Sequence, residues 1–125
     1  MNGRKALQGQ SILLVEDEYY QAIEVRRLLE DAGAKVVGPT AHAEDVAALL
    51  AENAVDAALI DINLGYGADF TVARSLRDAH VPFMFVTGYD ASSIPADLAT
   101  IPRLEKPAAE RNVIEQLAAL SSRTG

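Results

Sequence analysis

Five short apolar runs occur at regular intervals along the chain. The third run has four consecutive apolar residues, Ala57 to Ile60, and is followed by Asp61. Such a run, bounded by turn residues, is typical of a parallel strand that is buried on both faces. We therefore predict five strands, which lie within residues 11–15, 35–39, 57–65, 82–88 and 101–106.

Between these runs, apolar residues recur every three or four positions, as on one face of a helix. The spacing predicts a first helix through residues 22–32, with Gly33 as its C-terminal cap. A second helix is expected over residues 43–52. Asp69 is expected to cap the N-terminus of a third helix, and Pro107 is expected to open the last one.

The segment 89–100 departs from this regularity. It contains Ser92, Ser93 and Pro95 and few periodic apolar residues, so we predict a short, irregular or mobile helix there.

The alternation of strands and helices predicts an α/β fold, a flavodoxin-like doubly wound (βα)5 unit. Right-handed crossovers favour a five-stranded parallel sheet of order 2-1-3-4-5. The length of 125 residues suits one domain. We expect residues 1–10 to be a flexible N-terminal tail and residues 11–122 to form the domain.

Charge and composition narrow the possible functions. The formal net charge is −7 and the sequence pI is about 4.7, whereas nucleic-acid binding normally requires a basic face. No nucleic-acid partner is therefore expected. The chain has no cysteine, which excludes thiolate metal sites. We find no signal peptide or membrane span, and we expect a cytoplasmic protein.

Polar residues follow four of the predicted strands. In order 2-1-3-4-5 the carboxyl ends of these strands share one edge, where ligands of open parallel sheets bind. Clustered carboxylates repel one another unless a cation compensates them, and Mg²⁺ accepts such oxygen ligands. An ammonium and a hydroxyl beside the metal would suit an incoming phosphate. The pattern indicates phosphoryl capture by an Asp nucleophile. The residues concerned are Glu16, Asp17, Asp61, Thr87 and Lys106.

These residues lie in four motifs whose order and separation resemble a response-regulator receiver domain of two-component signalling. The motifs are Val15-Glu16-Asp17-Glu18, Asp61-Ile62-Asn63-Leu64-Gly65, Thr87-Gly88 and Lys106-Pro107. The resemblance covers about residues 10–122. Each motif is weak alone, but four in order at strand ends are specific.

The resemblance implies that Asp61 accepts a phosphoryl group from a phosphohistidine of a sensor histidine kinase or a histidine phosphotransferase. It also implies that Asp17, Asp61 and the backbone carbonyl of Asn63 hold Mg²⁺, while Glu16 assists through water. Thr87 and Lys106 would contact the acyl phosphate.

The resemblance further implies a cis peptide bond before Pro107, the kind of bond in which the cis form is cheap. Such a domain is a phosphoprotein rather than an enzyme, with slow autodephosphorylation.

A narrower resemblance concerns residues 82–89, Pro-Phe-Met-Phe-Val-Thr-Gly-Tyr. They resemble the stretch that names the FATGUY type of stand-alone receivers, which have no output domain and are associated with HWE or HisKA2-type kinases. Most receivers carry an aromatic switch residue where this chain has Arg103. Tyr89 and Arg103 are therefore the switch candidates.

Several alternatives remain open at this point. The chain could be a phosphate sink or a receiver-like adaptor that binds without phosphorylation. A phosphatase with an Asp nucleophile is a further alternative, although Asn63 stands where such enzymes carry a second Asp. A flavodoxin-like cofactor binder would need a phosphate-binding loop where this chain has Glu16-Asp17-Glu18.

Overall fold

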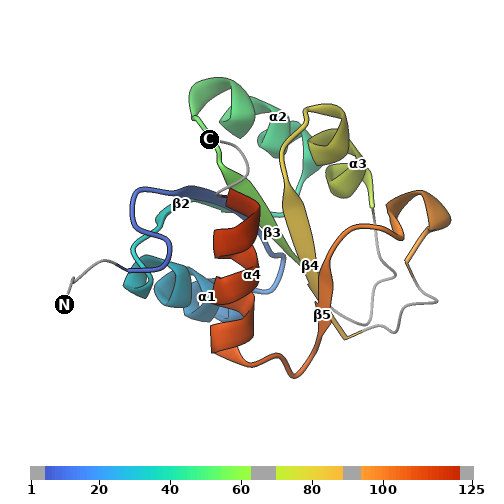
Figure 1. The fold of residues 1–125 in the computed structure, drawn as a ribbon. Coiled ribbons are helices and arrows are strands. Elements are labelled where there is room, and N and C mark those ends of the chain that lie inside the picture. The colour runs from blue at the N-terminus through green and yellow to red at the C-terminus, as the bar shows by residue number, and fades with distance from the viewer. Residues whose placement is uncertain (1–4, 63–69, 89–93, 122–125) are drawn as a thin grey trace.

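Strands and helices alternate along almost the whole chain in the computed structural model, which describes residues 5–62, 70–88 and 94–121 (Figure 1). The elements are β1 (Ser11–Val15), α1 (Tyr19–Asp31), β2 (Lys35–Thr40), α2 (Ala43–Glu52), β3 (Ala57–Ile62), α3 (Thr71–Asp78), β4 (Phe83–Thr87), the 3-10 helix η2 (Ala96–Leu98), β5 (Arg103–Glu105) and α4 (Glu110–Ser121). Among these residues, no helix has the length and apolar character that a membrane span requires.

The five strands form one parallel sheet in the predicted order β2-β1-β3-β4-β5. Helices α1 and α4 cover one face, and α2 and α3 cover the other (Figure 1). The flavodoxin-like α/β fold is therefore confirmed. Strand β5 lies at an edge of the sheet, as expected from the proline beside it.

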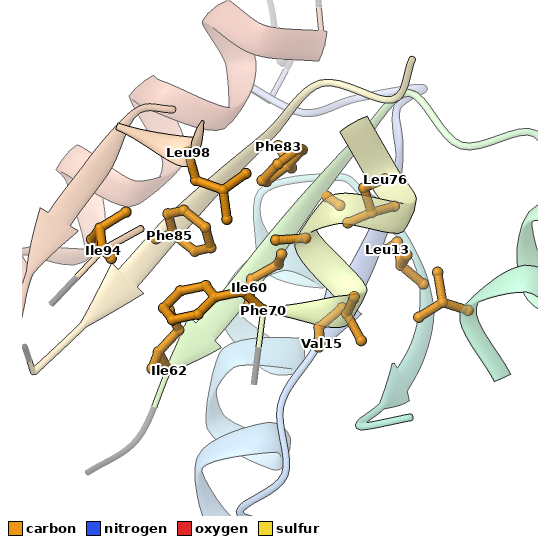
Figure 2. Packing of buried hydrophobic residues seen from close by; sticks show 14 of the residues in the cluster. Leu13, Val15, Ile60, Ile62, Phe70, Leu76, Phe83, Phe85, Ile94 and Leu98 are labelled. Carbon is orange, nitrogen blue, oxygen red and sulfur yellow. The ribbon is translucent and has the colours of Figure 1, made fainter. Parts of the chain in front are cut away.

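An aromatic group fills the core on the α2 and α3 face. Phe85 meets Phe70 and Phe83 edge to face, at ring-centroid distances of 5.9 and 5.7 Å, and Ile94 and Leu98 belong to the same cluster (Figure 2). This geometry is favourable for aromatic rings. Ile94 and Leu98 thus anchor the segment that follows β4, although its sequence has little helical periodicity.

Residues 5–10, which we predicted to belong to a flexible tail, pack against the domain in the structure. Leu7 is completely buried in the cluster under α1 and α4, and its N–H donates to the carbonyl of Ala32 at 2.8 Å. Gly33 has φ +98°, and a Cβ on it would lie 3.0 Å from the backbone of Gln8. A single leucine among polar residues produces no periodic pattern, so sequence analysis did not detect this packing.

Two helix starts also differ from their predictions. Helix α3 has Phe70 at its N-cap position, not Asp69, which lies outside the described residues. Helix α4 begins at Glu110 rather than at Pro107, because Ala109 provides the first carbonyl that accepts backbone N–H groups of the helix. The Lys106–Pro107 peptide bond is cis, as the family resemblance implies, and a second cis bond precedes Pro39.

Ion pairs join the segment after β4 to helix α3. Arg74 donates to both carboxylate oxygens of Asp97 at 3.0 and 3.1 Å, and Arg77 donates to the same carboxylate at 2.8 Å. The described part of the irregular segment, residues 94–100, contains the single 3-10 turn η2. The prediction of a short irregular helix is confirmed for this part, while residues 89–93 lie outside the described residues.

Because of these ion pairs, we expect the Asp97 carboxyl to have an unusually low pKa. The two guanidinium groups that bond to its carboxylate lower its pKa from 3.8 to about 2. Because the folded-state pKa is depressed, the pairing stabilises the fold above pH 3.8 and is lost as the pH falls towards 2. We expect carbon NMR of the carboxyl groups to place the Asp97 midpoint near 2. A midpoint near 3.8 would show that the pairs do not form in solution.

Candidate functional site

Three of the predicted site residues lie at the carboxyl ends of adjacent strands. Asp61, near the end of β3, and Thr87, the last residue of β4, are both buried. Ile62 pairs in register with Thr87 across the two strands. The N–H of Lys106 donates to the carbonyl of Thr87 at 2.8 Å, which fixes the start of the lysine side chain beside β4.

Asp61 and Lys106 form an ion pair at the centre of this edge. The Nζ of Lys106 lies 2.5 Å from Oδ1 of Asp61, and only 5% of the Asp61 side chain is exposed. Within the described part of the chain, this Oδ1 atom accepts no hydrogen bond of standard geometry. The ammonium is therefore the charge that compensates the buried carboxylate.

Gln21 also contacts Lys106, and no motif in the sequence pointed to it. Its Oε1 accepts a hydrogen bond from the Nζ of Lys106 at 3.0 Å, across a separation of 85 residues. Gln21 lies in the first turns of α1, next to the exposed Tyr19 and Tyr20. No motif marks this glutamine, because its role depends on how α1 packs beside the sheet.

Two acidic side chains of the loop after β1 accept hydrogen bonds from nearby backbone N–H groups. Glu16 is 96% buried, and its Oε2 accepts the N–H of Glu18 at 2.8 Å. Glu18 in turn caps α1 by accepting the N–H groups of Tyr20 and Gln21. Asp17 is exposed. The loop thus combines a helix cap with the predicted acidic residues.

Acidic side chains at this edge line hollows in the described part of the surface. Asp61 and Lys106 line a cavity of about 180 Å³ between α1 and α4, whose other walls include Val25 and Val113. Glu16 and Asp17 line a more open hollow beside β2 and the start of α2. Within residues 5–62, 70–88 and 94–121, no three acidic or histidine side chains are grouped closely enough to hold a metal ion. Oδ1 of Asp61 contacts the ammonium of Lys106, and Oε2 of Glu16 accepts a hydrogen bond from the backbone of its own loop.

The donors at this edge nevertheless fit a hard divalent cation. Val15 pairs with Ile60 between adjacent strands, so Glu16 and Asp61 follow at neighbouring positions of the sheet edge. Both are buried carboxylates, and among the residues that the structure describes Oδ1 of Asp61 accepts no hydrogen bond. Carboxylate oxygens are ligands that Mg²⁺ prefers.

Two further candidates, Asn63 and Tyr89, lie outside the described residues. Arg103 is half-buried on β5, where it pairs in register with Phe85.

Three comparisons with known proteins point to the same family. The model of the response regulator receiver domain family matches residues 12–117. "Response regulator UvrY" of Escherichia coli strain K12 is 32% identical over 120 residues, which are 90% of this chain and 54% of that protein. "Protein MrkE" of Klebsiella pneumoniae is 29% identical over 126 residues, 98% of this chain and 45% of that protein. The chain thus spans about half the length of the curated relatives it matches.

Solved structures agree with this result. The BeF3-activated conformation of SdrG from Pseudomonas melonis Fr1 is 32% identical, with a TM-score of 0.73, over 89% of this chain and 95% of that one. SdrG from Sphingomonas melonis Fr1 is 34% identical, with a TM-score of 0.71, over 92% and 97% of the two chains. A receiver protein from Sinorhizobium medicae WSM419 is 26% identical, with a TM-score of 0.74, over 95% and 99%. With its sheet order, its strand-end residues and these matches, the chain belongs to the response regulator receiver domain family.

Proposed function

We propose that this domain accepts a phosphoryl group on Asp61 and thereby switches the binding of a partner protein. The observation that carries the proposal is the buried carboxylate of Asp61, near the carboxyl end of β3, in direct contact with the ammonium of Lys106. Receiver domains obtain phosphoryl groups from histidine kinases or histidine phosphotransferases. They are not classical enzymes, although they phosphorylate and dephosphorylate themselves.

The transfer would use the side chains at this edge in distinct roles. An oxygen of Asp61 attacks the phosphorus of the donor, so a P–O bond forms while the P–N bond of phosphohistidine breaks. The donor imidazole keeps the electron pair of that bond and takes up a proton. Lys106 places a positive charge beside the phosphoryl oxygens, and the hydroxyl of Thr87 is a further donor to them.

Receiver domains generally bind Mg²⁺ at the phosphorylation site. We propose that Asp17, Asp61 and the backbone carbonyl of Asn63 hold the ion and that Glu16 assists through water. When bound, Mg²⁺ supplies charge that neutralises the carboxylates and the transferred phosphate. The chain's own contribution is to keep Glu16 and Asp61 buried and in place.

We also propose a receiver subfamily and a type of donor kinase for this domain. The stretch 82–89 supports a stand-alone receiver of the FATGUY type, served by an HWE or HisKA2-type kinase. The matches to SdrG support an activated state, because one of those structures is described as its BeF3-activated conformation. Tyr89 and Arg103 are the proposed switch residues. The segment anchored by Ile94 and Leu98 is the part we expect to repack.

A phosphodonor assay tests the proposal. Incubation with Mg²⁺ and acetyl phosphate should add the mass of one phosphate to the intact protein, and omission of Mg²⁺ should prevent this gain. Many turnovers on a phosphomonoester would instead indicate a phosphatase. Absence of any mass gain with an active donor kinase would favour an adaptor that works without phosphorylation.

A pull-down that compares phosphorylated with unphosphorylated protein separates a switch from a phosphate sink. A switch retains a partner in only one of the two states, whereas a sink retains none in either state.

A further inference from the structure

The hydrogen bond between Gln21 and Lys106 connects α1 to the phosphorylation site. Gln21 Oε1 accepts from the Nζ of Lys106 at 3.0 Å, and the same nitrogen contacts Asp61. The ammonium therefore contacts a charged group on β3 and also a neutral amide on the helix.

The backbone of Gln21, from which the side chain extends, is held by a hydrogen bond. Its backbone N–H donates to Oε2 of the capping residue Glu18 at 2.7 Å, and the N–H of Glu18 donates to Oε2 of Glu16 at 2.8 Å. This series of bonds ties the first turn of α1 to the acidic loop. The side-chain amide of Gln21 thus extends from a helix turn whose backbone is held by hydrogen bonds.

Lys106 has no comparable rigidity of its own. Its ammonium stands on a flexible four-carbon stem, and 28% of the side chain is exposed, so it has space to turn into solvent. Once Asp61 carries a phosphoryl group, the carboxylate oxygen that forms the new bond loses its negative charge. Gln21 then remains as a protein group that can hold the ammonium beside the phosphoryl oxygens.

We propose that Gln21 is a positioning residue that holds Lys106 in place for phosphoryl transfer to Asp61. The inference rests on the proposed function of Asp61. Gln21 does not contact the phosphoryl group in this assignment and acts only through the lysine.

The test is a double-mutant cycle of phosphorylation rates. Gln21→Met keeps the length and helix propensity of the side chain but removes the acceptor oxygen. We expect the maximal rate with acetyl phosphate to fall about 3- to 10-fold, because the ammonium is no longer oriented. The half-saturating Mg²⁺ concentration should stay unchanged, because the amide bonds to the lysine and not to the acidic residues.

The decisive comparison is made in a Lys106→Ala background, with the slow rate followed by intact mass over long incubations. If Gln21 acts through Lys106, adding Gln21→Met there should change the rate by less than about 1.5-fold. An equal fall in both backgrounds, or no fall in the wild-type background, would overturn the inference.

Control variants distinguish a specific effect of Gln21 on the rate from a general effect of the substitution or from unfolding. Gln116→Met makes the same change on α4, where Gln116 lines a different surface hollow, and should keep the wild-type rate. Gln21→Ala provides a second variant if Gln21→Met unfolds. If the wild-type protein takes up no phosphate at all, the proposed function fails, and this outcome is distinct from a wild-type rate that does not depend on Gln21.

Discussion

Asp61→Asn is expected to abolish phosphate uptake completely. Asparagine has nearly the same shape but lacks the anionic oxygen that attacks phosphorus, so no acyl phosphate can form. The fold should persist, because Lys106 keeps its hydrogen bond to Gln21 and is partly solvated. Intact-mass measurement after incubation with Mg²⁺ and acetyl phosphate checks the result, and thermal unfolding checks the fold.

The matched control is Asp56→Asn, which makes the same Asp-to-Asn change at the residue directly before β3. The Oδ2 of Asp56 accepts the N–H of Ser11 at 2.7 Å, and asparagine retains an oxygen for that bond. Asp56→Asn should therefore be phosphorylated as the wild type is. A mass gain in Asp61→Asn equal to that of the wild type would refute Asp61 as the acceptor.

Leu7→Ala is expected to lower the free energy of unfolding by about 3 kcal/mol, since it removes a fully buried side chain and leaves a cavity. The loss should appear in urea denaturation as a lower midpoint with an unchanged slope. Ile23→Ala, on the exposed side of α1, should change stability by less than about 0.5 kcal/mol. A Leu7→Ala value as small as that of Ile23→Ala would show that residues 5–10 do not pack in solution.

The sequence predicted the strands and their order well because both depend on local patterns and simple rules of topology. A run such as Ala57 to Ile60 is apolar on both faces, and this requires a buried strand whatever its neighbours are. The placement of Asp61, Thr87 and Lys106 at one edge followed from the parallel order alone. Helix starts were less accurate, because the helix N-cap at Phe70 has no polar side chain to mark it.

The amino-acid sequence by itself determined the α/β fold, the parallel sheet and which residues stand at the carboxyl ends of its strands, since spacing and polarity along the chain carry that information. Only the tertiary structure decided which side chains meet there. It paired Lys106 with Gln21 across 85 residues, turned Glu16 towards its own loop and buried Leu7. Such contacts depend on how distant elements pack, and no local pattern in the chain encodes the packing partner of a single residue.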